Sequence, residues 1–200
     1  MSVPMIVKHR YAGVRSMKVK AARGHLCAHL KYIEHRRRDE TESRDDRRIF
    51  DAESNVVNRA TAINDVMEHA GTRDAYYHKV MLSPGPDVPV ADYRQWTRDL
   101  MRDLEEKQGK TLHWYAVQHR NTDHFHVHVV IAGTGERFDT GQPEAIILRP
   151  DDYAFLKERG RARSEQAHRQ HLQETLQEIE NRDDTVASQH ELLRVQGRER

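Results

Sequence analysis

Apolar and polar residues alternate most regularly over residues 125–132 (FHVHVVIA). This period of two is that of a β-strand, in which successive side chains point to opposite faces. The pattern predicts a strand that carries His126 and His128 on the same face, with their Cα atoms about 7 Å apart. Shorter apolar runs predict further strands over residues 4–8, 75–83 and 111–118.

A helical period appears from residue 25 onward. Leu26, Leu30 and Ile33 recur at i, i+4 and i+7 and are expected to face the core. Tyr32 falls on a different side of this helix. The pattern therefore predicts a tyrosine that points away from the apolar stripe.

Two more amphipathic helices and a long C-terminal helix are predicted. The first of these begins near Asp51, an N-cap candidate, and ends at Gly71, while the second ends at Gly109. Beyond Pro150 the chain is rich in Arg, Glu and Gln and has only a thin apolar stripe. A dimerisation arm, a DNA clamp and a frayed tail all remain open for that segment. The apolar positions are, in the first helix, Val56, Ala60, Ile63, Met67 and Ala70; in the second helix, Tyr93, Trp96, Leu100 and Leu104; and in the C-terminal helix, Leu156, Leu172, Leu176 and Ile179.

The size of the chain limits how many domains it can form. It has 200 residues, 36% of them hydrophobic and 32% charged, with a mean hydropathy of −0.93. That composition suffices for one domain with a core, and the mixture of strands and helices favours an α+β fold. We divide the chain into a domain over residues 1–150 and a charged helical extension over residues 151–200, whose order the pattern leaves open.

The formal net charge of +1 conceals a strongly basic start. Residues 1–38 contain ten Lys or Arg against one acid, Glu34, whereas residues 161–200 contain seven Arg and eight acids, which nearly cancel. The first segment is expected to form a face that binds a polyanion. A solvated run of charge is the alternative, and charge alone would favour it.

Cysteine usage and hydropathy indicate where the chain works. Cys27 is the only cysteine, so no intrachain disulfide can form, and a reducing interior is expected. No segment approaches the roughly 20 apolar residues of a membrane span. We expect a soluble, cytoplasmic protein without membrane insertion.

Four histidines lie within ten residues: His119, His124, His126 and His128. His119 ends one predicted strand and the last two share a face of the next, so three imidazoles can converge. Three nitrogen donors with open coordination positions are typical of a catalytic metal site rather than a closed structural one. Asp123 could orient a ligating imidazole. A satisfied surface pair of histidines is the alternative.

The run from His119 to His128 resembles the third motif of conjugative and mobilisation relaxases of the HUH endonuclease superfamily. The segment around Tyr32 resembles their first motif, and the strand ending at Ser83 resembles their second. The resemblance covers about residues 20–135. Phe125 stands where the family often has proline, and Asn121 stands where an acid is common.

This resemblance implies a fold and a reaction. The fold would be an antiparallel central sheet of about five strands with helices packed on it. Tyr32 would attack single-stranded DNA at an origin of transfer and give a 5′-phosphotyrosine and a free 3′-hydroxyl. Asp123, His124 or a metal-bound hydroxide would take the phenol's proton, and the metal would be held by His119, His126 and His128.

The metal and the partners follow from the same resemblance. The working ion would be Mn or Mg, although imidazole ligands also suit Zn, Ni or Co. The protein would initiate mobilisation of a plasmid or related element, together with accessory DNA-binding proteins and type IV secretion coupling proteins. Side chains that would hold the DNA are Ser83, which could equally be a turn residue, Arg23, Arg36, Arg37 and Arg38.

Two other functions compete with this one. A rolling-circle replication initiator of the same superfamily carries its tyrosine after the histidines, and Tyr153 would fill that place here. A non-enzymatic DNA-binding accessory protein with a structural metal is the second alternative. Tyr11, Tyr76 and Tyr77 are further candidates for the nucleophile.

Overall fold

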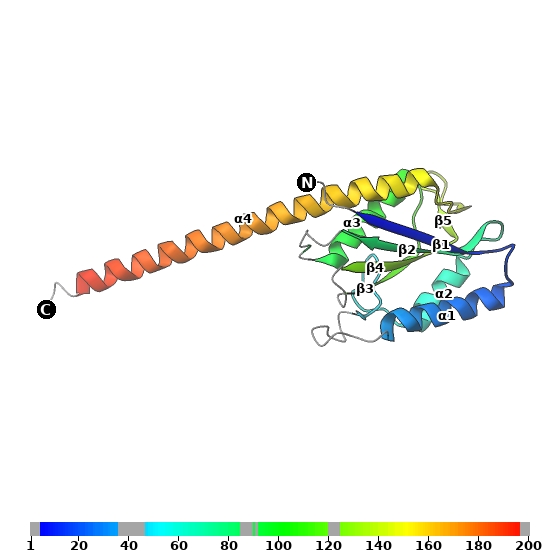
Figure 1. Ribbon diagram of the computed structural model, residues 1–200, viewed down its shortest axis with the longest axis horizontal. Helices are drawn as coiled ribbons and strands as arrows, with labels where there is room; N and C mark the ends of the chain where they lie inside the picture. The colour runs from blue at the N-terminus through cyan, green and yellow to red at the C-terminus, as the bar shows by residue number, and fades with distance from the viewer. Residues whose placement is uncertain (1–4, 36–46, 85–89, 91, 120–124, 197–200) are drawn as a thin grey trace.

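A computed structural model describes residues 5–35, 47–84, 90, 92–119 and 125–196, with the backbone alone at 171, 180 and 183–196 (Figure 1). At its centre lies an antiparallel sheet of four strands in the order β1-β2-β4-β3. The predicted α+β architecture is confirmed, with four strands in this sheet and two more in a separate ribbon. The strands are β1 (Ile6–Gly13), β2 (Ala75–Ser83), β3 (Trp114–His119), β4 (His126–Ala132), β5 (Thr134–Glu136) and β6 (Pro143–Ala145).

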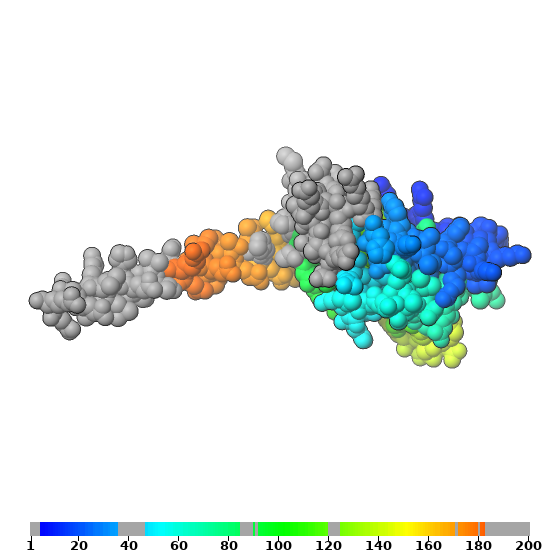
Figure 2. Space-filling view, turned by 90° about the horizontal axis from the view of Figure 1, so that it is seen from below, coloured from blue at the N-terminus to red at the C-terminus, as the bar shows by residue number. Residues whose placement is uncertain are grey.

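Helices α1 (Val19–His35) and α2 (Arg59–Glu68) cover one face of this sheet (Figures 1 and 2). The predicted stripe of α1 is buried, and the Arg59 guanidinium joins the two helices by an ion pair with Glu34 at 2.6 Å. Asp51 does not cap α2. Its carboxylate accepts hydrogen bonds from the backbone of residues 53 and 54, and Asn58 caps the helix instead, because the chain first turns back so that Val57 forms a bridge with Ile49.

The opposite face is covered by α3 (Tyr93–Gln108) and by the first turns of α4 (Pro150–Gln196). Asp92 caps α3 by accepting hydrogen bonds from two backbone amides, and Gly109 ends it at a φ of 65°, a conformation that favours glycine. The buried positions of α4 recur every fourth residue, at Asp152, Leu156, Gly160 and Ser164. The Trp96 indole donates to the Gly160 carbonyl at 3.4 Å, so the two helices touch at a residue without a side chain.

A buried carboxylate also fastens α4 to α3. Asp103 is 3% exposed and accepts two hydrogen bonds from Arg159 and two from Arg163, at 2.6–3.0 Å. Burial alone would raise the pKa of Asp103, but the hydrogen bonds from the two guanidinium groups lower it to about 2. Beyond this anchor α4 extends away from the body (Figure 1), with Leu172, Leu176 and Ile179 about half exposed. A functional division at residue 150 stays a prediction.

None of the described helices is both long enough and apolar enough to cross a bilayer.

We predict that Asp103→Asn destabilises the fold by about 2 kcal/mol at pH 7, because two guanidinium groups lose a buried carboxylate. Since the folded-state pKa is lowered, this stabilisation is present above about pH 4 and is lost as the pH falls toward 2. Urea unfolding at pH 7 and pH 3 should therefore show the wild type approaching the variant at the lower pH. Asp139→Asn removes an exposed carboxylate that also pairs with an arginine, and it should change stability little. Equal effects of the two substitutions at pH 7 would contradict the anchoring role.

Candidate metal centre and active site

Three histidines converge because of the register between β3 and β4. His119, the last residue of β3, lies directly opposite His126, the first residue of β4, and His128 follows on the same face. The ring centroids are 4.8–5.1 Å apart in all three pairs. His119 is 1% exposed and His126 9%. The predicted convergence of these three side chains is confirmed.

The donor set fits a divalent metal ion. One nitrogen of each ring lies within 4.8 Å of the others, and two nitrogens bound at about 2.1 Å to one tetrahedral ion are roughly 3.4 Å apart, so small rotations of the rings suffice to bring all three onto one ion. Three neutral imidazoles leave coordination positions for water or substrate, and they suit Mn, Zn, Ni or Co better than Mg. The three residues could therefore hold a catalytic ion.

A backbone carbonyl of α1 fixes the tautomer of one of these rings. His119 Nε2 lies 2.7 Å from the carbonyl oxygen of Ile33. Because a carbonyl can only accept, Nε2 carries the proton and donates, which leaves the lone pair of a neutral imidazole on Nδ1. Metal-ligating histidines are commonly held in this way by a backbone carbonyl.

The same hydrogen bond brings the end of α1 to the histidines. Tyr32 precedes Ile33 and is 56% exposed, which confirms the prediction that it points away from the buried stripe. One turn earlier, the ring of His29 lies edge-on to that of His128, with centroids 6.1 Å apart. Since residues three apart on a helix are neighbours, Tyr32 belongs to the part of α1 that borders the three histidines.

His29 was missed at the sequence level. Burial, and then the charge of Lys79, lower the pKa of His29 to about 4, so this ring is neutral at neutral pH. Lys79 itself has a lowered pKa, caused by burial and by the charge of Arg10 opposite it on β1. The signal that could have found His29 is its spacing of three residues from Tyr32.

Of the side chains predicted to contact DNA, the structure describes Ser83 and Arg23. Ser83 is 2% exposed, and its hydroxyl donates to the Phe125 carbonyl at 2.7 Å, which holds the chain just before His126. Arg23 is exposed on α1 and donates to Asn64 at 2.6 Å. A DNA contact by either residue stays a prediction. Asp123, His124, Arg36, Arg37 and Arg38 lie outside the described residues.

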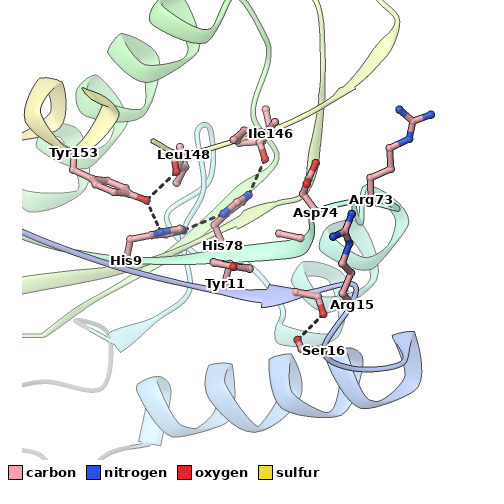
Figure 3. Close-up of a pocket in the computed structure, with 13 residues that line it drawn as sticks. His9, Tyr11, Arg15, Ser16, Arg73, Asp74, His78, Ile146, Leu148 and Tyr153 are labelled. Carbon is pink, nitrogen blue, oxygen red and sulfur yellow. Dashed lines mark hydrogen bonds between the residues drawn. The ribbon is translucent and has the colours of Figure 1, made fainter. Parts of the chain in front are cut away.

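The alternative tyrosines do not join the three histidines. Tyr153 lies on the opposite face of the sheet, where its hydroxyl is 2.7 Å from His9 Nδ1 and 2.9 Å from the Leu148 carbonyl (Figure 3). Tyr77 is buried and Tyr76 partly buried, and their hydroxyls donate to backbone carbonyls of residues 22 and 17. Tyr11 is exposed, on the same side of β1 as His9.

A second group of possible ligands has an unsuitable geometry. One atom each of Asp65, His69 and His113 lies within 4.8 Å of the others. The two imidazole rings, however, stack face to face at 3.5 Å with an interplanar angle of 8°. Their lone pairs lie in parallel planes and cannot both point at one ion. These residues form instead a polar cluster with Glu136 that links α2, the start of β3 and β5.

Comparison with known proteins gives one family match. The model of the relaxase family, MobA/VirD2-like nuclease domain, matches residues 32–142, more than half of the chain. None of the curated proteins matches significantly.

Two solved structures resemble the chain distantly. One is the conjugative relaxase TrwC in complex with oriT DNA in a metal-bound form, with 14% identity, a TM-score of 0.49, and 85% of this chain and 70% of that chain covered. The other is described as the molecular basis of vancomycin resistance transfer in Staphylococcus aureus, with 13% identity, a TM-score of 0.41, and coverage of 86% and 94%.

We predict that His126→Ala and His128→Ala each weaken Mn²⁺ binding at least about 100-fold, because each removes one of three ligands. Isothermal titration calorimetry would measure this, and the affinity should fall as the pH is lowered because protons compete for the same nitrogens. His168→Ala, on α4, is the matched control and should bind as the wild type does. Unchanged Mn²⁺ affinity in the two ligand variants would show that the ion binds elsewhere.

Proposed function

Because the chain belongs to the MobA/VirD2-like relaxase nuclease family, we propose that it nicks and rejoins one DNA strand at an origin of transfer. Tyr32 is the nucleophile, and His119, His126 and His128 hold the divalent ion. The observation that carries this proposal is the hydrogen bond between His119 and the Ile33 carbonyl, which ties the residue next to Tyr32 to a metal ligand.

The proposed chemistry is a transesterification. The Tyr32 oxygen bonds to phosphorus, the bond from phosphorus to the 3′ oxygen breaks, and the phenol's proton ends on the released 3′-hydroxyl. A bound Mn or Mg ion would polarise the non-bridging oxygens and stabilise the charge that develops on them. Because the 5′-phosphotyrosine keeps the energy of the broken ester, the 3′-hydroxyl can reverse the reaction and reseal the strand without ATP.

Removal of the phenol's proton needs help, since the unperturbed pKa of tyrosine is about 10. Asp123 and His124 are the proposed acceptors. The neutral imidazole of His29 packs beside His128 without adding a competing positive charge.

Basic side chains on the edge strand β1 share the face of the sheet that carries the three histidines. Lys8 lies opposite Met81, and Met81 opposite His128, so the three side chains share the face that carries the histidines. With strands about 4.8 Å apart, the backbone of Lys8 lies about 10 Å from that of His128. Lys8 and Arg10 are exposed on the edge strand β1. They are suited to bind the phosphates of a single strand that enters the site.

The further partners rest on the family alone. A relaxase that initiates mobilisation of a plasmid or related element would work with accessory DNA-binding proteins and with a type IV secretion coupling protein. The predicted contacts from Ser83, Arg23 and residues 36–38 belong to the same proposal.

We predict that Tyr32→Phe abolishes a covalent DNA adduct that the wild type forms. Labelled single-stranded oligonucleotides from the transfer origin of the native element, incubated with Mn²⁺ and resolved on a denaturing gel, would measure it. Tyr153→Phe and Tyr11→Phe are matched controls and should keep the adduct. Loss of the adduct in Tyr153→Phe but not in Tyr32→Phe would favour the rolling-circle initiator, and DNA binding without any adduct would favour the accessory protein.

We also predict that Lys8→Ala/Arg10→Ala weakens binding of single-stranded DNA. If each side chain neutralises one phosphate, the slope of log affinity against log salt concentration should become shallower by about 1.4. Fluorescence anisotropy at several salt concentrations would measure the slope. Lys157→Ala/Arg161→Ala removes the same charge from exposed positions of α4 and should leave the slope unchanged. An equal change in both pairs would indicate an effect of net charge alone.

A further inference from the structure

A pocket of about 480 Å³ lies away from the three histidines, at the end of the sheet where β1 ends and β2 begins (Figure 3). It opens on the face of β1 that carries His9 and Tyr11, opposite to the face that carries Lys8 and Arg10. Its size is within the range of ligand pockets, about 300–1,000 Å³. The mechanism proposed above uses none of its residues.

Four rings form one wall of this pocket. The His9 ring lies 5.9 Å from Tyr11 and 5.2 Å from His78, stacked on both, and 5.3 Å from Tyr153. Tyr11 is 61% exposed, so the ring at the mouth presents a free face. Such a wall offers a flat aromatic surface on which a planar group can stack.

A chain of hydrogen bonds holds this wall rigid. His78 Nε2 is 3.0 Å from the Ile146 carbonyl, which can only accept, so His78 Nδ1 keeps its lone pair and accepts from His9 Nε2 at 3.0 Å. The Tyr153 hydroxyl lies 2.7 Å from His9 Nδ1 and 2.9 Å from the Leu148 carbonyl, so it extends the chain to a second backbone carbonyl. Burial lowers the pKa of both imidazoles, that of His78 to about 4, in keeping with this neutral arrangement. The wall is therefore built before any ligand arrives.

Two arginines stand together at the mouth of the pocket. The backbone amide of Val14 donates to the carbonyl of Asp74 at 3.0 Å. Arg15 follows Val14 and Arg73 precedes Asp74, so this hydrogen bond places both arginines at the same rim. Both are exposed, and within the described part of the chain neither forms an ion pair. Guanidinium groups of this kind bind phosphate. The Asp74 carboxylate, which also lines the pocket, can accept a hydrogen bond from an amino group.

We propose that this pocket binds one nucleotide of a single DNA strand, with the base stacked on Tyr11 and the phosphate held by Arg15 and Arg73. The combination of a preformed aromatic wall and two arginines matches the chemistry of a nucleotide, a planar base attached to an anion. Identification of the ligand as DNA rests on the proposed function.

Helix α1 begins three residues after Ser16 at the pocket rim and ends next to Tyr32, a span of 17 residues or about 25 Å. One strand several nucleotides long could therefore occupy both sites.

Binding of free nucleotides and of DNA tests this proposal. Calorimetry with the four deoxynucleoside monophosphates, and anisotropy with a labelled single-stranded oligonucleotide, would use the full chain. We expect Tyr11→Ala to weaken both about fivefold or more, the lower end of the effect of removing a stacking residue, and Tyr11→Phe to preserve both. Arg15→Ala/Arg73→Ala should also weaken both. Arg161→Ala/Arg169→Ala removes the same charge from exposed positions of α4 and is the matched control.

The outcomes separate this proposal from the proposed function. If Arg15→Ala/Arg73→Ala and the control Arg161→Ala/Arg169→Ala weaken oligonucleotide binding equally, or if neither changes it, the pocket assignment is overturned. A covalent DNA adduct of the wild type that requires Tyr32 would still support the relaxase function in that case. Pocket-dependent binding of free nucleotides with unchanged DNA affinity would overturn DNA as the ligand in favour of a free nucleotide. Pocket-dependent binding of both, in a wild type that forms no adduct, would uphold the pocket and reject the nicking function.

Discussion

The hydrogen bond from His119 to the Ile33 carbonyl is the contact on which the candidate active site depends. The last four carbonyls of an α-helix have no donor within the helix, and Ile33 lies in the last turn of α1. His119 therefore satisfies a helix end and has its own tautomer fixed by the same bond. The register of β3 and β4 places His126 opposite His119, so this one contact aligns the helix that carries Tyr32 with two strands of histidines.

The sheet separates two kinds of chemistry because its side chains alternate between faces. On β1, Lys8 and Arg10 point to the face that carries the histidines, while His9 and Tyr11 point to the face that carries the pocket. The edge strand β1 thus contributes side chains both to the face with the three histidines and to the pocket. The strand is able to do so because α1 and α2 cover the sheet only in part, and three of its residues on the metal face remain exposed.

Sequence periodicity predicted the parts of the site that are local. The alternation over residues 125–132 placed His126 and His128 on one face, and the helical stripe from Leu26 placed Tyr32 off the core, because each pattern repeats within a single element. Contacts between distant residues could not be read in this way. Tyr153 meets His9 across 144 positions and His119 meets Ile33 across 86. Asp51 looked like a helix cap because capping chemistry is local, whereas the segment before α2 is shaped by bridges to other parts of the chain, between residues 49 and 57 and between residues 50 and 116.

Different helices support the two sites, which makes their stability separable. The candidate metal site is formed by β3 and β4 and is joined to α1 by the hydrogen bond between His119 and Ile33. The pocket wall includes Tyr153, which is part of α4, and α4 is fastened to α3 through Asp103 and the close approach at Gly160. Tyr153 lies in the first turn of that helix, next to Asp152, which forms a further ion pair with Lys107 of α3. The described first turns of α4 pack on the face of the sheet opposite to the one that carries the three histidines and α1, so the C-terminal helix and the candidate metal ligands lie on different sides of the sheet.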